Sequence, residues 1–328
     1  MTESRLIQLG LCCLNTELRG QKPSVFCSRT MIMRSIKEKG IDVLKAKIKE
    51  NLEDLIKMIE WNEAHGIRVM RLSSTLFPHK TNPSIENYTY DFAQPLFEKI
   101  KETHKKYGHR LTFHPGQYNV LGTNDEKKLQ HTIDDLTYHA DVLDFLDVNE
   151  NGVMVIHGGG TYGNKPATIN RWCDNYVKLP EKIKRRLVLE NCEKSFSIGD
   201  CIEISKRVNI PVVLDTHHYE CFKHYHPEEA DKLKPIEEFI PEILDSWKRR
   251  GIKPKFHVSE QGNGQVGHHS DFIEIIPNYL LEIPEKYGVE IDIMIEAKMK
   301  EQAIFKLYEK YPQLSCRKKY KYKIKSYN

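Results

Sequence analysis

Histidine and carboxylate side chains stand at the ends of several short apolar runs in this sequence. In the clearest case, Leu111 and Phe113 lead to His114, and Pro115-Gly116 then prevent the strand from continuing. Imidazole and carboxylate ligands together suit Zn²⁺ or Mn²⁺ better than Ca²⁺. The residues of this type are His114, His157, Glu190, Asp215, His217, His218, His257, His269 and Glu296.

These nine candidates exceed what one tetrahedral ion needs. Two or three ions that share bridging carboxylates would use them, and paired ions suit the displacement of a phosphoryl oxygen. Singly, each residue has an ordinary structural explanation: a strand-end histidine forms hydrogen bonds, and an acidic residue caps a helix. His217 and His218 would point in opposite directions in an extended segment, so only one of them is expected to be a ligand, and His268 raises the same question for His269.

The elements that must position these residues follow from apolar periodicity. Strands are expected at 5–13, 67–73, 110–114, 152–157, 186–190, 211–215, 255–259 and 290–296. Helices are expected at 41–65, 89–107, 128–146, 168–183, 197–208, 236–250, 271–287 and 299–312. Eight strands that alternate with helices predict an α/β fold, a (β/α)8 TIM barrel forming a single domain over 1–328. A doubly wound sheet is the competitor, but no Gly-x-Gly-x-x-Gly turn follows the first strand.

A barrel would bring the candidate ligands together. The strand-end members are separated by 25 to 43 residues, which is the length of one strand–helix unit. Because all strands of a barrel end at one rim, where active sites are built, these side chains are expected to converge on one cavity.

Two basic residues belong to the same strands. Lys255 shares a strand face with His257. If it faces the cavity, it would be a buried neutral amine, pair with a carboxylate, or react with CO₂ to become a carbamate ligand. The alternative is a solvated lysine at the start of the strand. Arg71 ends the second strand, where it would either hold a phosphate or form a salt bridge inside the barrel.

The bulk composition fits an intracellular globular protein. Hydrophobic content is 39%, charged content is 29% and the net charge is +4, which permits an anionic partner without requiring one. The eight cysteines form no CxxC pair, which favours a reducing compartment. No signal peptide, membrane span or obligate protein partner is evident. The basic tail at 315–328, with Tyr320 and Tyr322, is expected to be a frayed terminus, with a nucleic-acid contact as the alternative.

Several ordered motifs resemble the UV damage endonuclease family and, more distantly, the endonuclease IV and xylose-isomerase-like TIM barrels. The motifs are His114-Pro-Gly-Gln-Tyr118, Ile156-His157-Gly-Gly, Leu189-Glu190-Asn, Leu214-Asp215-x-His-His218, Lys255-x-His257 and Glu296-Ala-Lys-x-Lys300, with Leu9-Gly10, Asn15 and Arg71-x-Ser-Ser74. They run in order from about residue 6 to 312.

The resemblance implies a TIM barrel with a rim cluster of two or three divalent ions, usually Mn²⁺, with Zn²⁺ as the alternative. It implies a DNA repair endonuclease that acts on damaged double-stranded DNA, in a nucleoid or, in a eukaryote, a nucleus. Metal-activated water would cut immediately 5′ of cyclobutane pyrimidine dimers, 6-4 photoproducts and some abasic sites, leaving a 3′-hydroxyl and a 5′-phosphate.

The family pattern also implies residue roles. Gln117 and Tyr118 would wedge into the duplex, Asn15 and Arg71 would contact DNA or the lesion, and Glu190, Lys255 and Glu296 would be catalytic. Leu11 stands where the family often has an aromatic residue, which predicts a different lesion-binding surface. The implied metal ligands are His114, His157, Glu190, Asp215, His218, His257, His269 and Glu296.

Two other functions remain open on the residues alone. A metal-dependent sugar isomerase on the same barrel would use the same strand-end ligands without an exposed Gln-Tyr pair. A non-catalytic nucleic-acid-binding module would explain the basic tail but not the ligand set. The metal content of the purified protein would distinguish the binding module from the two enzymes, because a pure binding module need not carry two or three Mn²⁺ or Zn²⁺ ions per chain.

Overall fold

Eight parallel strands form the centre of the computed structural model, which describes residues 6–230 and 232–315. The strands are β1 (Ile7–Cys12), β2 (Val69–Arg71), β3 (Arg110–Thr112), β4 (Met154–His157), β5 (Leu187–Glu190), β6 (Val212–Val213), β7 (Lys255–Val258) and β8 (Ile291–Ile295). They pair in the orders β3-β2-β1-β8-β7 and β4-β5-β6. Parallel bridges Phe113–Met154 and Asp215–His257 join the two sheets into a ring, which confirms the predicted barrel.

The strands are buried along their whole length or nearly so. All four residues of β4, β5 and β7 and all five of β8 are buried, because helices cover the outside of the ring and side chains fill its interior. This double burial explains why the strands appear in the sequence as continuous apolar runs rather than as alternating ones. Buried polar residues interrupt these runs: His157 and Glu190 are the last residues of β4 and β5, Lys255 and His257 lie in β7, and Asp292 lies in β8.

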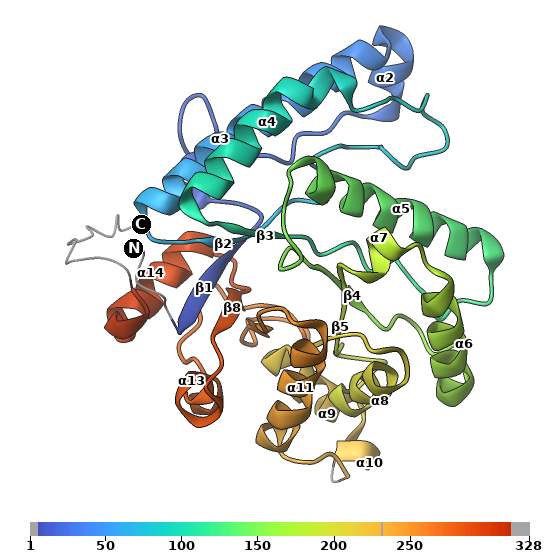
Figure 1. Cartoon of the computed structure of the whole chain (residues 1–328), viewed down its shortest axis with the longest axis vertical. Helices are drawn as coiled ribbons and strands as arrows, with labels where there is room; N and C mark the ends of the chain where they lie inside the picture. Colours follow the sequence, from blue (N-terminus) through green and yellow to red (C-terminus); the bar gives the residue numbers. More distant parts are fainter. Residues whose placement is uncertain (1–5, 231, 316–328) are drawn as a thin grey trace.

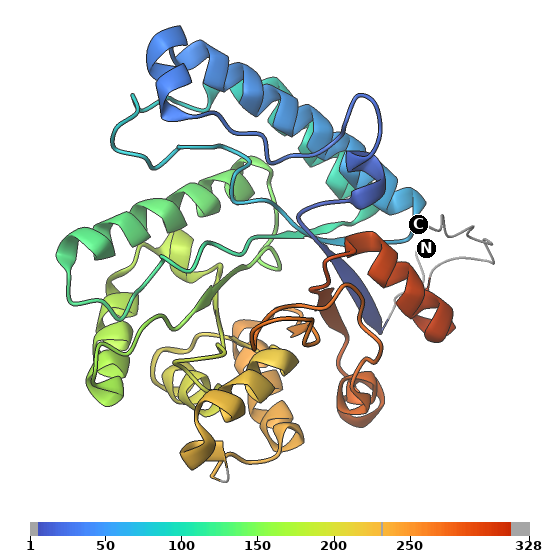
Figure 2. The ribbon, with the colours of Figure 1, turned by 180° about the vertical axis from the view of Figure 1, so that it is seen from behind.

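The helices form the outer layer in both views of the ribbon (Figures 1 and 2). They are α1 (Thr16–Arg19), α2 (Met33–Lys39), α3 (Ile41–Ala64), α4 (Gln94–Tyr107), α5 (Glu126–Phe145), α6 (Lys165–Lys178), α7 (Glu181–Lys184), α8 (Ile198–Val208), α9 (Thr216–Tyr225), α10 (Pro227–Ala230), α11 (Ile240–Arg250), α12 (Asn278–Leu281), α13 (Ile283–Tyr287) and α14 (Lys300–Lys310). Short 3-10 helices are η1 (Asp91–Ala93), η2 (Ile236–Phe239) and η3 (Pro312–Leu314).

Two helical predictions differ from the structure, and one helix beside the candidate ligands was not predicted. The helix expected at 271–287 is reduced to α12 and α13, because Pro277 biases the residue before it away from the helical conformation. The helix expected at 168–183 is divided into α6 and α7 at Leu179-Pro180. Helix α9 was not predicted, so the assumption that His217 and His218 lie in an extended segment is wrong.

Helix α9 begins directly at the end of the sixth strand because Asp215 caps it. The Asp215 side chain accepts hydrogen bonds from the backbone N–H groups of His217 and His218, at 2.8 and 2.9 Å. An acidic N-cap of this kind satisfies helix donors that otherwise have no partner. The same residue is therefore both a cap and a candidate ligand.

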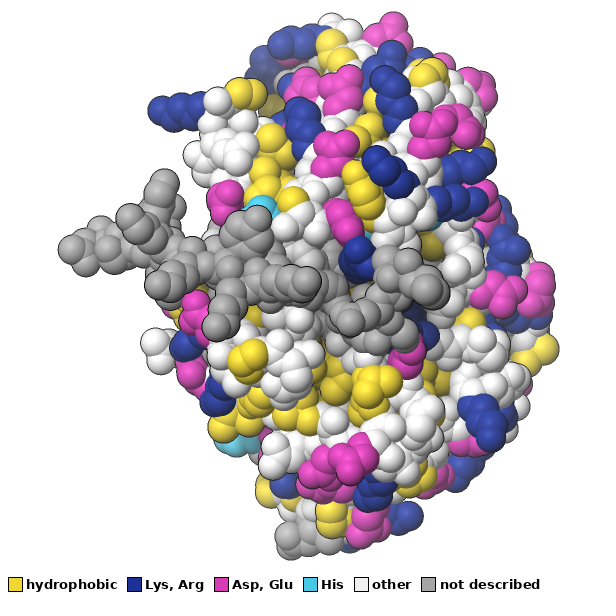
Figure 3. Space-filling model, turned by 60° about the vertical axis from the view of Figure 1, so that its left-hand side comes forward, with side chains coloured by type: hydrophobic (Ala, Val, Ile, Leu, Met, Phe, Trp, Pro, Cys, Tyr) yellow, Lys and Arg dark blue, Asp and Glu magenta, His cyan; other side chains and the backbone are white. Residues whose placement is uncertain are grey.

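Charged groups of both signs share the surface. Figure 3 shows Lys and Arg side chains interspersed with Asp and Glu on one face, so the described residues of that face form no patch of a single sign. The seven cysteines within the described ranges are free. Among the described residues, no helix has the length and apolar character needed to cross a membrane. Residues 316–328, nearly all of the predicted basic tail, lie outside the described residues.

His109 gives the barrel a pH-dependent stability. Its ring is buried, Nε2 lies 3.2 Å from Glu63 Oε2, and burial outweighs that carboxylate and lowers the pKa of His109 from 6.5 to about 4. Between these two values the unfolded chain binds a proton that the folded chain does not, so stability falls as pH drops. We expect the free energy of unfolding of the wild type to fall by about 3 kcal/mol between pH 6.5 and 4 because of this residue.

Urea unfolding of the wild type and His109→Gln at pH 7, 5.5 and 4.5 measures this contribution. The variant should lose less stability than the wild type over the same pH interval, because its side chain binds no proton. Equal losses in both proteins would show that His109 is not the titrating group.

Candidate metal centre

The carboxyl ends of the strands bring six predicted residues to one rim of the barrel. His157 and Glu190 are the last residues of β4 and β5 and are directly paired in the ladder, while Asp215 and His257 are paired by the bridge between β6 and β7. His114 follows β3 and Glu296 follows β8. The convergence expected from the spacing of these residues is therefore present in the structure.

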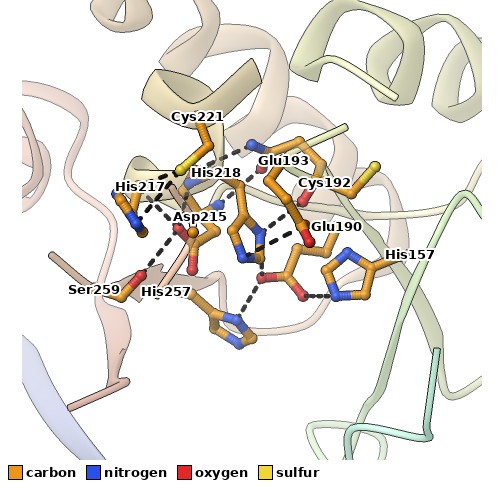
Figure 4. Close-up of polar contacts among 12 residues, drawn as sticks. His157, Glu190, Cys192, Glu193, Asp215, His217, His218, Cys221, His257 and Ser259 are labelled. Carbon is orange, nitrogen blue, oxygen red and sulfur yellow. Dashed lines mark hydrogen bonds and ion pairs between the residues drawn. The ribbon is translucent and has the colours of Figure 1, made fainter. Parts of the chain in front are cut away.

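Glu190 lies at the middle of this group. Figure 4 shows His157, His218 and His257 around its carboxylate. Glu190 Oε2 lies 2.8 Å from His114 Nε2 and 3.6 Å from His157 Nε2. Glu190 Oε1 lies 2.8 Å from His257 Nδ1 and 3.7 Å from His218 Nδ1. Burial alone would raise the pKa of Glu190, but His257, His157 and His114 outweigh it and hold the pKa well below its usual range.

Asp215 and His218 form the second half of the group. Burial is the main cause that raises the pKa of Asp215 to about 7, and Glu190 and Glu296 add to it. Burial would lower the pKa of His218, but the carboxylates of Asp215 and Glu190 raise it to about 9. This pair therefore holds protons near neutral pH. A metal ligand must be deprotonated, so metal binding here is expected to release them.

Three buried polar atoms of this group lack a hydrogen-bond partner in the described part of the chain, which bears on whether its residues fit a metal ion. His157 Nδ1, His257 Nε2 and Asp215 Oδ2 have no hydrogen-bond partner among the described residues. Burying such atoms without a partner is costly, and a cation would satisfy any of them that faces it. The ring nitrogens that face Glu190 are the other two, His157 Nε2 and His257 Nδ1. Ligand atoms of His114, His157 and Glu190 lie within 4.8 Å of one another, as do those of Glu190, Asp215 and His257. The residues fit divalent metal, with Glu190 common to both sets.

The charges on either side of this group are paired inside the barrel. Arg71 Nη1 donates to Glu296 Oε1 at 2.6 Å, and His257 Nδ1 lies 3.2 Å from the same oxygen. The salt bridge considered for Arg71 is therefore present. Burial would raise the pKa of Glu296, but Arg71 and His257 lower it well below its usual range.

Lys255 is fully buried below this group. Its Nζ donates to Thr112 Oγ1 at 3.1 Å. Burial, with Arg110 and Arg71 nearby, lowers the pKa of Lys255 to about 7, so the amine is partly neutral at neutral pH. The solvated-lysine alternative is excluded by this burial.

His217 and His269 lie apart from Glu190. His217 contacts Cys221, with 3.4 Å between Nε2 and Sγ, and Figure 4 shows it on the side of Asp215 away from Glu190. It lines a cavity of about 650 Å³ together with Cys221 and Tyr279. The His269 ring is centred 6.2 Å from that of His217, and the structure does not bring it into either set of three ligands.

The predicted DNA-contacting residues differ in exposure. Gln117 and Tyr118 are exposed on the loop after β3, and Tyr118 is 66% exposed. Asn15 is only 1% exposed and caps α1 by accepting from the backbone N–H of Leu18, so its side chain has a structural role here. Leu11 is fully buried, so the structure does not support a different lesion-binding surface at that position.

Several residues of the site were not singled out from the sequence. The Asn191 side chain accepts from the backbone N–H of Asp215 at 2.8 Å and donates to its carbonyl at 3.0 Å, which fixes the start of α9. Ser259 Oγ lies 3.5 Å from Asp215 Oδ1, and Glu193 Oε2 lies 4.0 Å from His218 Nε2. Only Asn191 had a signal, because it follows Glu190 in one of the quoted motifs.

Comparison with known proteins links this site to one family. Residues 7–325 match the model of the family described as UV-endonuclease UvdE. A UV-damage endonuclease of Schizosaccharomyces pombe is 39% identical over 93% of this chain, and a UV DNA damage endonuclease of Bacillus cereus is 32% identical over 93%. The match covers 50% of the S. pombe protein and 94% of the B. cereus protein, so this chain spans about half the length of the fungal relative.

Solved structures agree on the fold. The crystal structure named SacUVDE matches with a TM-score of 0.78 at 28% identity, over 94% of this chain and all of that one. Endonuclease IV from Thermus thermophilus and a D-psicose 3-epimerase from Clostridium cellulolyticum both match with a TM-score of 0.53 at 15% identity, over 79% and 80% of this chain and 94% of each of theirs. Because a nuclease and a sugar enzyme match equally well, the barrel alone does not choose between the two functions.

Proposed function

The chain belongs to the UV-endonuclease UvdE family, and on this premise we propose that it is a metal-dependent DNA repair endonuclease. It nicks duplex DNA immediately 5′ of UV photoproducts and some abasic sites and leaves a 3′-hydroxyl and a 5′-phosphate. The observation that carries the metal-dependent part is the carboxylate of Glu190, which belongs to two adjoining sets of ligand atoms whose residues, apart from the half-buried His114, are buried. Because the proposed substrate is DNA, we expect the protein to act in a nucleoid or, in a eukaryote, in a nucleus.

The proposed ligands divide around Glu190. His114 and His157 hold one side, and Asp215 and His257 hold the other. His218 and Glu296 belong to neither set of three but lie 3.7 Å from Glu190 and 3.2 Å from His257. His269, which belongs to neither set, stays a prediction. Two or three divalent ions, Mn²⁺ in preference to Zn²⁺, are proposed. When bound, they supply Lewis-acid stabilisation of phosphate oxygens and lower the pKa of water.

The chain's own residues prepare the site for an anionic phosphodiester. Glu190 and Glu296 stay ionised because their histidine and arginine neighbours lower their pKa. Arg71 is held by Glu296 and Lys255 by Thr112, so both are positioned by the barrel interior rather than free to move toward DNA. We therefore assign Arg71 first to orienting Glu296 and balancing its charge. Lys255, a partly neutral amine held below the ligands by Thr112, keeps the catalytic role that the family pattern implies.

The exposed loop after β3 carries the residues that we propose reach the lesion. A photodimer stacks and pairs poorly, so moving it out of the helix costs less than for intact bases. Tyr118 is exposed and aromatic, and such a ring can stack on a base in the gap. Gln117, its neighbour, carries an amide that can donate to and accept from bases left without a partner.

A labelled duplex with one defined cyclobutane dimer tests the proposal, with added Mn²⁺ or with a chelator. We expect a nick directly 5′ of the dimer that needs metal and is absent from undamaged duplex, with 3′-hydroxyl and 5′-phosphate ends. Cleavage of an abasic duplex alone would contradict the photoproduct specificity. No cleavage of either duplex at any metal concentration would contradict the proposed function.

A further inference from the structure

We propose that Asp135, on α5, is a positioning residue that holds the probe segment, residues 115–119, in the conformation that presents Tyr118 to DNA. The proposal rests on the proposed function and extends it to a residue outside the metal centre. Asp135 is 4% exposed, whereas Tyr118 at the tip of the probe segment is 66% exposed. The buried carboxylate of Asp135 thus contacts Tyr118, the exposed aromatic side chain of the probe segment.

Asp135 binds the probe segment through two oxygens. Its Oδ1 accepts from the Tyr118 hydroxyl at 3.2 Å, and its Oδ2 accepts from Asn119 Nδ2 at 2.8 Å. Asn119 also closes the turn, since its side chain and its backbone N–H both donate to the Gly116 carbonyl, at 2.9 and 3.0 Å. One carboxylate therefore holds two successive residues of the segment.

Gly116 shows that the Tyr118 ring packs closely on its own loop. A Cβ added to Gly116 would lie 2.4 Å from Tyr118 Cε1, which is far inside van der Waals contact. The ring thus rests on the glycine while its hydroxyl reaches Asp135. This arrangement needs both a residue without a side chain at 116 and an acceptor at 135.

The tyrosine stays a hydrogen-bond donor to Asp135. Burial of the hydroxyl, together with the Asp135 carboxylate, raises the pKa of Tyr118 to about 12. The phenol is therefore neutral at physiological pH and donates to Asp135 Oδ1. Charge-assisted bonds of this kind are stronger than bonds between neutral groups.

Asp135 is itself held by His139 on its own helix and by Thr81 on the segment between β2 and η1. His139 Nδ1 lies 3.5 Å from Asp135 Oδ2, one turn along α5, and Thr81 Oγ1 lies 3.5 Å from Oδ1. The segment is further fixed where it enters the next turn, because Thr132 Oγ1 accepts from the backbone N–H of Val120 at 3.1 Å. An aromatic ring held in this way loses less conformational freedom on meeting DNA than one on a free loop.

Asp135→Asn and its neighbour Asp134→Asn form a matched pair for the test. Asp134 is exposed and accepts only from Gln130 among the hydrogen bonds found for its side chain, so its substitution controls for the change of charge on α5. In Asp135→Asn an amide N–H₂ replaces one acceptor, and it faces either the Asn119 amide or the Tyr118 hydroxyl, both of which donate. We expect amide hydrogen exchange across 116–120 in the DNA-free protein to become about tenfold faster in Asp135→Asn only.

The kinetic readout separates positioning from chemistry. With duplex carrying one cyclobutane dimer, Asp135→Asn should raise KM about tenfold and leave kcat within about twofold, because the metal centre is untouched. Tyr118→Phe, which removes only the hydroxyl, should shift both readouts the same way by a smaller amount.

The exchange and kinetic measurements test the anchoring of the segment and its role in DNA binding separately. Equal exchange in Asp135→Asn and Asp134→Asn would overturn the anchoring of the segment. Faster exchange with unchanged KM would overturn the positioning role in DNA binding. If the wild type does not nick the dimer duplex, the proposed function fails, and the exchange experiment alone still decides whether Asp135 anchors the probe segment.

Discussion

Replacing Glu190 by Gln is expected to reduce nicking of a dimer-containing duplex by at least about a thousandfold and to deplete bound divalent metal. The substitution keeps the size of the side chain but removes its charge. Glu190 is fully buried and has imidazole nitrogens of His114 and His257 at 2.8 Å. It is also the member shared by both sets of candidate ligands, so one change should disturb the whole centre.

The measurement combines single-turnover nicking with the metal content of the purified protein. Glu203→Gln is the matched control, because Glu203 is exposed on α8 and its contact is a surface ion pair with Arg207 at 3.4 Å. That variant should retain wild-type activity and metal. Glu190→Gln with wild-type nicking and full metal content would show that the metal centre is assigned to the wrong residues.

Replacing Asp292 by Ala is expected to lower the free energy of unfolding by about 3–5 kcal/mol, the largest effect on stability that we predict. Asp292 lies in β8 at the opposite end of the barrel and is 1% exposed. Its carboxylate oxygens lie 2.7 Å from Arg110 Nη1 and 2.7 Å from Lys253 Nζ. Removing the acid takes away the ion-pair partner of the buried Arg110 and leaves Lys253 with Glu290 alone, at 3.9 Å.

Urea unfolding of metal-free protein at neutral pH measures this loss. Asp42→Ala is the control, because Asp42 forms an exposed ion pair with Lys45, and its loss should cost at most about 1 kcal/mol. The metal content per folded Asp292→Ala chain should match the wild type. A loss no larger than that of the control would show that the Arg110–Asp292–Lys253 cluster contributes little to stability.

The two predictions reflect a difference between the two ends of the same barrel. At the Asp292 end, opposite charges meet and are paired, and Asp292 Oδ1 relies on its ion pair with Lys253 because it accepts no hydrogen bond from a described residue. At the Glu190 end, His157 Nδ1, His257 Nε2 and Asp215 Oδ2 are buried without a hydrogen-bond partner among the described residues. Paired charges at the amino ends of strands stabilise a barrel, whereas unsatisfied ligand atoms at the carboxyl ends are typical of a reaction site.

The sequence by itself determined the strands, the barrel and most of the candidate ligand set. Strands buried on both faces are mostly apolar, so a polar residue at the end of an apolar run stands out, as Glu190 does after Leu187–Leu189. The repeat of strand and helix then places these ends at one rim. The motifs around His114 and Glu190 were specific enough for the resemblance to the family, which the family match confirms.

Only the tertiary structure decided which of these residues touch. Helix α9 depends on the Asp215 cap, which is a single side-chain contact and leaves no periodic signal in ten residues. The central place of Glu190, the Arg71–Glu296 pair and the contact of Asp135 with Tyr118 join residues from different strand–helix units. Periodicity reports the local face of an element, whereas such contacts depend on strand register and on how far each side chain reaches, and these are fixed only when the barrel closes.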